Sequence, residues 1–102
     1  QLCTPASVDS ISSSNNQEDH VSMGANAATK AYRVLRNVEK VLAIELMSAA
    51  QALDFRRPLK SSERVEAVVA AFRSEVSFVK QDRVLHDDMK QAVRFLQTYS
   101  FN

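Results

Sequence analysis

The chain has 102 residues, the length of one small domain or of a piece of a larger protein. Its 13 Lys and Arg residues against 12 Asp and Glu residues give a net charge of +1, which argues against a generic nucleic-acid binder and a polybasic membrane-surface protein. With only one glycine, the chain cannot form a turn-rich all-β domain or a glycine loop that cradles phosphate. With only one cysteine, it cannot form an internal disulfide framework or a thiolate zinc cluster.

The apolar runs are far shorter than the ~18 residues that span a bilayer. The N-terminus also lacks the basic and apolar regions of a secretory signal. We therefore expect no membrane segment and a cytoplasmic location. Because the first residue is Gln1 rather than Met, we also expect the chain to be a fragment of a longer protein.

The N-terminal segment, residues 1–17, is predicted to be a loop that leads into a helix. It is rich in Ser and Asn, whose side chains hydrogen-bond to nearby backbone and compete with regular structure. Asn15 and Asn16 are candidate helix caps. Glu18 and Asp19 would place negative charge in the first turn, where the helix dipole favours it.

A very long helix is predicted over residues 18–55. Its apolar residues recur at steps of three and four, and Pro58 ends it. Such a helix would be ~57 Å long, whereas a compact domain of this size has a radius of gyration of only ~13 Å. Residues 41–50 are apolar on almost every side, and too few residues remain to bury them. Other chains or absent parts of this chain must do so, and we predict self-association through residues 34–53.

Two shorter helices are predicted over residues 62–76 and 87–99. Ser61 and Ser62 are candidate caps of the first. Apolar stripes at helical spacing lie on both, formed by Val65, Val68, Val69, Phe72 and Val76 in one and by Met89, Val93 and Leu96 in the other. The predicted fold class is therefore all-α, a long helix followed by two short ones, packing into an oligomeric helical bundle.

Several candidates for chemistry have simpler structural interpretations. Cys3 has no local base or helix to activate its thiol. His86 precedes two aspartates, but adjacent helical residues do not face one another, so we expect no metal site. The basic residues of the long helix are expected to form a solvated or ion-paired face: Lys30, Arg33, Arg36 and Lys40.

The densest group of functional side chains lies between Asn15 and Gly24, where amide, carboxylate and imidazole groups meet at the start of the predicted helix. From the residues alone, this segment is either an elaborate helix cap or part of a functional site. Both interpretations remain open at this point.

The run Gln17-Glu18-Asp19-His20-Val21-Ser22-Met23 resembles the C-terminal signature of the histidine ammonia-lyases, in the aromatic amino acid ammonia-lyase family. Further segments resemble that family in the same order along the chain: residues 5–11, 42–46, 49–54 and 82–85. The chain departs from the usual pattern at Ser12-Ser13, where Pro-Thr is usual, and at His86-Asp87, where Tyr-Pro is common. Neither departure lies within the signature at residues 17–23.

The resemblance implies an all-helical, cytoplasmic homotetramer that converts L-histidine to trans-urocanate and ammonia. Its electrophile would be a methylidene-imidazolone group made from an internal Ala-Ser-Gly. This chain contains no Ala-Ser-Gly, so it would be the C-terminal segment only, with the group formed outside it. We therefore predict that the chain alone is inactive.

The resemblance also assigns roles within the signature. Glu18 would be catalytic and would bind the substrate imidazole, with Gln17 and Asn16 as further substrate-binding groups. Relatives that act on phenylalanine or tyrosine typically carry Gln where this chain has Glu18, so the carboxylate favours histidine. His20 is expected to support the helix start rather than to catalyse.

Two alternatives remain. The parent protein could be an ammonia-lyase or aminomutase acting on another aromatic amino acid. The chain could instead be a helical oligomerisation module with no enzymatic role.

Overall fold

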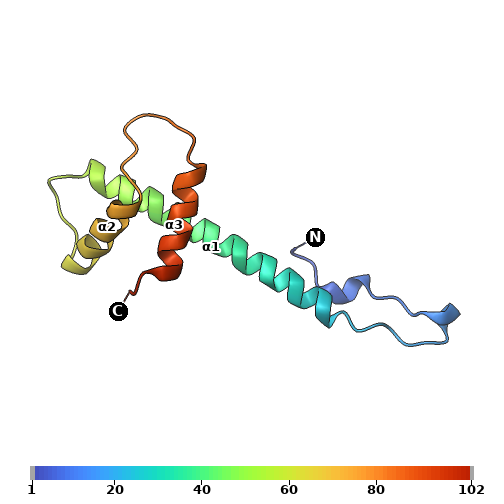
Figure 1. The fold of residues 1–102 in the computed structure, drawn as a ribbon. Helices are drawn as coiled ribbons and strands as arrows, with labels where there is room; N and C mark the ends of the chain where they lie inside the picture. Colours follow the sequence, from blue (N-terminus) through green and yellow to red (C-terminus); the bar gives the residue numbers. More distant parts are fainter. Residues whose placement is uncertain (1, 102) are drawn as a thin grey trace. The chain divides into compact units, whose positions relative to one another are not determined.

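A computed structural model describes residues 2–101 (Figure 1). Over these residues the chain forms three α-helices and two short 3-10 turns, with one isolated β-bridge and no strand. The predicted all-α fold class is confirmed. The chain divides into two compact units, one running to Val38 and the other beginning at Glu39, and the long helix α1 (Gly24–Phe55) contributes to both. No helix within residues 2–101 is long and apolar enough to cross a bilayer.

In the first unit, the N-terminal segment lies beside the start of α1. It contains the 3-10 turns η1 (Ala6–Asp9) and η2 (Ser14–Asn16). The ammonium of Lys30 donates hydrogen bonds to the carbonyl and hydroxyl oxygens of Thr4, which ties this segment to α1.

The predicted start of the long helix at residue 18 is wrong, because α1 begins at Gly24. Asn15 and Asn16 are not its caps, since both lie in η2 with left-handed backbone angles. The residues that follow η2 are held in a loop by bonds to the segment before it. The Ser12–His20 β-bridge requires backbone angles at His20 that a helix starting at Glu18 would not allow.

The second unit contains the end of α1 together with α2 (Glu63–Glu75) and α3 (His86–Thr98), which lie within one residue of the predicted ranges at each end. Ser62 caps α2 as expected, accepting a hydrogen bond from the Val65 amide at 3.4 Å. The Glu66 carboxylate accepts from the Ser61 amide at 2.8 Å. That bond, together with the neighbouring Arg57 guanidinium, lowers the pKa of Glu66.

The core of the second unit is small and aromatic. α1 contributes the alanines Ala43 and Ala50, and α2 and α3 contribute the rings. The rings of Phe72 and Phe95 meet edge to face with centroids 5.3 Å apart, and Tyr99 stacks on Phe95 at 4.7 Å. The buried members of this core are Ala43, Ala50, Phe72, Val76, Ala92 and Phe95.

Replacing Phe95 by Ala should therefore destabilise the chain by about 3–5 kcal/mol, since it leaves a cavity where the ring packs between Phe72 and Tyr99. Urea unfolding followed by circular dichroism at a fixed protein concentration measures this loss. Phe55→Ala is the matched control, because that ring is 72% exposed and contacts only Phe78 among the described aromatic rings. Its cost should be about 0.5–1.5 kcal/mol, the contribution of one aromatic pair. Equal losses for the two variants would contradict this description of the core.

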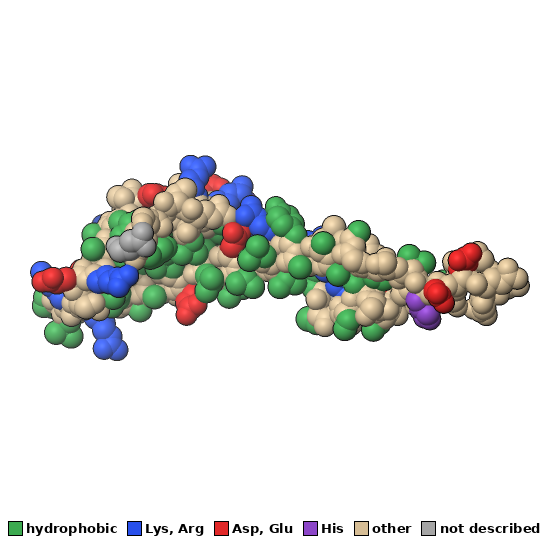
Figure 2. All heavy atoms as spheres, turned by 90° about the horizontal axis from the view of Figure 1, so that it is seen from below, with side chains coloured by type: hydrophobic (Ala, Val, Ile, Leu, Met, Phe, Trp, Pro, Cys, Tyr) green, Lys and Arg blue, Asp and Glu red, His purple; other side chains and the backbone are tan. Residues whose placement is uncertain are grey.

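α1 carries large apolar side chains that neither unit covers. Figure 2 shows apolar side chains open on the face that it draws. Leu42, for example, is 49% exposed although it lies in the middle of the longest helix. Six exposed large apolar residues of α1 lie within the range predicted to self-associate, namely Val34, Leu35, Val38, Val41, Leu42 and Ile44.

Candidate functional site

The three residues predicted for the site, Asn16, Gln17 and Glu18, lie together in the loop between η1 and α1. The loop is closed by pairing between its two sides. The Ser10 hydroxyl donates to the Val21 carbonyl at 2.8 Å, Ser12 and His20 form an antiparallel bridge, and the Glu18 amide donates to the Ser13 carbonyl at 3.2 Å. Glu18 therefore lies in a hydrogen-bonded turn, and its own backbone amide makes one of the bonds that close the turn.

The tip of this loop has an unusual backbone. Ser14, Asn15 and Asn16 have φ angles of 50°, 58° and 67°, three consecutive residues in the left-handed region without a glycine. Such residues cost roughly 1–3 kcal/mol each, although asparagine tolerates this region better than most. Strained segments of this kind cluster at functional sites. The strain lies directly before Gln17 and Glu18.

The side chains of Asn16, Gln17 and Glu18 differ in their hydrogen bonding. The side-chain amide oxygen of Asn16 accepts a hydrogen bond from the Ser12 hydroxyl at 2.7 Å, so Asn16 helps to hold the loop. The side chains of Gln17 and Glu18 are exposed and have no hydrogen-bond or ion-pair partner among the described residues. Their amide and carboxylate are free to meet a ligand or another chain.

Chemically, the loop presents a carboxylate that can accept an N–H bond or take a proton, next to an amide that can both donate and accept. An exposed carboxylate on one loop lacks walls that exclude water, which enzyme sites need if charges are to act strongly. An enzyme site built on this loop would need such walls from other segments or from other copies of the chain.

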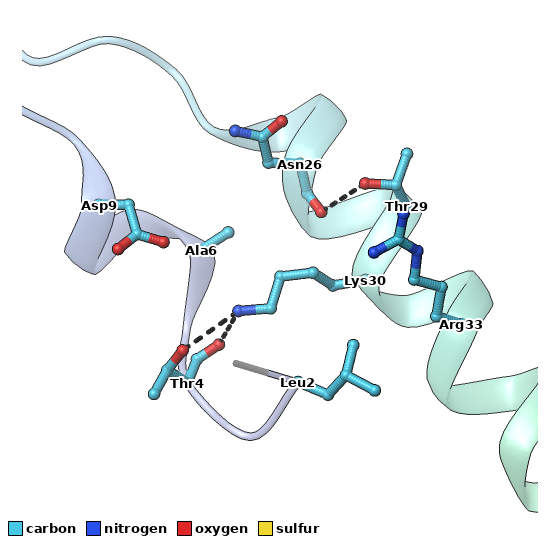
Figure 3. A pocket seen from close by; sticks show the side chains of 8 residues that line it. All are labelled: Leu2, Thr4, Ala6, Asp9, Asn26, Thr29, Lys30 and Arg33. Atoms are coloured by element: carbon cyan, nitrogen blue, oxygen red, sulfur yellow. Dashed lines mark hydrogen bonds between the residues drawn. The ribbon is translucent and has the colours of Figure 1, made fainter.

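A separate pocket of about 450 Å³ lies between the N-terminal segment and α1 (Figure 3). Lys30 reaches across it to Thr4, while Arg33 and Asp9 lie on its edges, and none of the three predicted site residues lines it. Lys30 was expected on a basic face of the helix. Instead it ties the N-terminal segment down, and nothing in the spacing of the basic residues could have identified Thr4 as its acceptor.

Nothing in this chain can form the electrophile that the sequence resemblance implies. That group needs an Ala-Ser-Gly, and the sole glycine, Gly24, follows Met23. Among residues 2–101, no three His, Cys, Asp or Glu side chains are grouped as a metal ion would need. The free thiol of Cys3 is exposed.

Sequence reasoning predicted Asn16, Gln17 and Glu18 as site residues, and it missed the strained loop tip that precedes Gln17. The available signal was the run Ser14-Asn15-Asn16, because asparagine is the residue besides glycine that most readily adopts left-handed angles. The interpretation of both asparagines as helix caps overlooks this preference.

Comparison with known proteins finds relatives that are histidine ammonia-lyases. The histidine ammonia-lyase of Anaeromyxobacter sp. (strain K) is 55% identical over 89 residues, which are 87% of this chain and 18% of that protein. That of Desulfotalea psychrophila is 46% identical over 101 residues, or 99% of this chain and 20% of that protein. The crystal structure of histidine ammonia-lyase from Trypanosoma cruzi matches with a TM-score of 0.86 and 45% identity, covering 95% of this chain and 19% of that chain.

This chain thus spans about a fifth of the length of these relatives. A family model described as aromatic amino acid lyase matches residues 1–74. Since that match covers most of the sequence, the chain belongs to the aromatic amino acid lyase family.

Proposed function

We propose that the protein containing this chain eliminates ammonia from L-histidine to give trans-urocanate, and that this chain supplies Glu18 to the active site. The observation that carries the proposal is the carboxylate of Glu18, which is exposed and unpaired on a strained, bonded loop. Family membership supports an ammonia-lyase, and the relatives named above are histidine ammonia-lyases.

In this proposal the Glu18 carboxylate accepts an N–H of the substrate imidazole, or takes a proton from the substrate during elimination. A phenyl ring offers no N–H, so a carboxylate enclosed against it would be left unpaired at a cost. Gln17 contributes a polar group to the pocket wall. Asn16, bonded to Ser12, holds the loop tip and can still donate through its amide nitrogen.

The methylidene-imidazolone group would supply the electrophile that activates the substrate for loss of ammonia. Because this chain contains no Ala-Ser-Gly, the group would form elsewhere in the parent protein. We propose that this chain forms three parts of the parent enzyme. Residues 1–17 are a loop that leads into the active site, α1 is a helix of the oligomeric bundle, and α2 and α3 are two short helices that follow it.

We further propose that the parent protein is a homotetramer in which α1 packs against copies of itself. The apolar side chains left exposed along α1 support this assembly. It would also bring other copies to the Glu18 loop to complete the site. The exposed free thiol of Cys3 suits a reducing compartment, so the cytoplasm is part of the proposal.

The isolated chain should produce no urocanate from histidine, because it cannot form the electrophile and lacks the rest of the site. Product formation is measured for the purified chain and, as the positive control, for the full-length parent at the same molar concentration. Histidine-dependent urocanate formation by the chain alone would contradict the proposal. So would a full-length parent that forms none.

A further inference from the structure

We propose that Ser12 is a positioning residue, whose hydroxyl holds the tip of the loop so that the Glu18 carboxylate keeps one fixed direction toward the substrate. This role rests on the proposed function, since it concerns the group that would meet the imidazole. All of the contacts that carry it lie within residues 10–21, in the unit that ends at Val38. These contacts are made inside the chain, whichever of its faces the rest of the parent protein covers.

Ser12 differs from its neighbours in its burial. Within residues 7–22, only Ser10 and Ser12 are half-buried, whereas even the apolar side chains of this segment are exposed. A serine has little apolar surface to bury, so the reason for its position lies in its hydroxyl. The Ser10 hydroxyl is bonded to the Val21 carbonyl, and the Ser12 hydroxyl donates to the side-chain amide oxygen of Asn16 at 2.7 Å.

Asn16 is the residue through which Ser12 acts. It is the last of the three left-handed residues at the tip, with a φ of 67°, and it directly precedes Gln17 and Glu18. Its bond to Ser12 is its one side-chain hydrogen bond among the described residues. A hydrogen bond and the strain of one left-handed residue are of similar size, so this bond can decide whether Asn16 keeps its conformation. A change in its backbone angles would turn the Glu18 side chain, two residues further on, in a different direction.

The base of the loop stays closed without this hydroxyl. The Ser10–Val21 bond and the Ser12–His20 bridge close it, and the bridge uses the backbone of Ser12 rather than its side chain. Replacing Ser12 by Ala should therefore loosen the tip alone. Because a displacement of about 1 Å at a reacting group can cost about 10²-fold in rate, a loosened tip would impair turnover while the fold is retained.

The test is a double-mutant cycle in the full-length parent, with initial rates of urocanate formation and thermal melting measured for each purified variant. Ser12→Ala should lower kcat by about tenfold or more and leave the melting temperature nearly unchanged. Ser12→Thr keeps the hydroxyl and should stay within about threefold of the wild-type rate, because the bond to Asn16 can still form. Ser7→Ala is the matched control, since it removes an exposed hydroxyl of the same segment that has no bonded partner among the described residues. It should turn over normally.

The cycle measures whether Ser12 acts through Glu18. In the Glu18→Gln background, Ser12→Ala should cause no further loss of kcat, because the carboxylate that Ser12 positions is already absent. An equal loss in both backgrounds would overturn the proposal. So would a Ser12→Thr enzyme as slow as Ser12→Ala, or a Ser12→Ala enzyme that no longer folds, since Ser12 would then support the structure in general.

Failure of this inference can be distinguished from failure of the proposed function. If Glu18→Gln is slow while Ser12→Ala turns over normally, the positioning role is wrong and the role of Glu18 stands. If Glu18→Gln turns over normally, or the wild-type parent forms no urocanate, the proposed role of Glu18 is wrong and the positioning role of Ser12 is overturned with it.

Discussion

Replacing Glu18 by Gln in the full-length parent should lower the rate of urocanate formation by about 10²–10⁴-fold, the usual contribution of a positioned acid–base group. The change keeps the shape of the side chain and removes its negative charge. If the carboxylate takes or orients a proton of the substrate, an amide cannot replace it. Glu18→Ala should be at least as damaging.

The same variant should leave the fold intact. Glu18 is exposed, its side chain has no bonded partner among residues 2–101, and it lies before α1 rather than in its first turn. Its removal should therefore change the unfolding free energy by no more than about 0.5 kcal/mol. Asp19→Asn is the matched control, an exposed neighbour in the same loop that should keep near-normal turnover. A Glu18→Gln enzyme within about threefold of the wild-type rate, far below an acid–base contribution, would make Glu18 a structural residue.

Leu42→Glu should dissociate or unfold the assembly formed by the isolated chain. Leaving a large apolar side chain in water costs about 1.5–3 kcal/mol, and α1 exposes several of them. Several such contributions are comparable to the whole stability of a small domain, about 5–15 kcal/mol. A carboxylate at the centre of this face would be buried without a partner in any assembly that uses it. Sedimentation equilibrium measures the change in molecular mass.

Val84→Glu is the control for this experiment. Val84 is 86% exposed and lies in the loop before α3, outside the α1 face, so the same type of change should leave the mass unaltered. Circular dichroism of both variants separates dissociation from unfolding. A well-folded wild-type monomer at micromolar concentration would refute self-association, whatever the variants do.

The last two helices could be predicted almost to the residue, because local signals agree there. Ser62 caps α2, and acidic residues fill the first turn of both α2 and α3. The apolar stripe of α2 includes the buried ring of Phe72, whereas the stripe predicted for α3 misses the buried ring of Phe95. The end of α1 was equally predictable, because Pro58 cannot continue a helix.

The start of α1 could not be predicted in this way. Glu18 and Asp19 have the charge typical of a first turn, but pairing between Ser12 and His20 and between Ser10 and Val21 holds this segment in a loop. These bonds join residues eight to eleven positions apart, and helix-capping rules describe contacts only three or four residues apart.

The sequence predicts which residues form the candidate site, and that choice stays a prediction, whereas it could not predict the geometry of the loop that contains them. The resemblance to histidine ammonia-lyases singled out Glu18, Gln17 and Asn16, and the family itself is confirmed. The strained turn before them depends on positive φ angles at Ser14 and Asn15. Asparagine adopts such angles more often than most residues, but its presence alone does not fix them.

The most direct test of the central claim is the rate of ammonia elimination by the full-length wild-type parent on L-histidine, L-tyrosine and L-phenylalanine under identical conditions. If Glu18 meets an imidazole N–H, histidine should be converted to urocanate while neither of the other two amino acids reacts. Preferential elimination from phenylalanine would contradict the account, because the carboxylate would then face a ring with no donor. Preferential elimination from tyrosine would contradict it as well, because the partner of the carboxylate would then be a phenol O–H rather than an imidazole N–H.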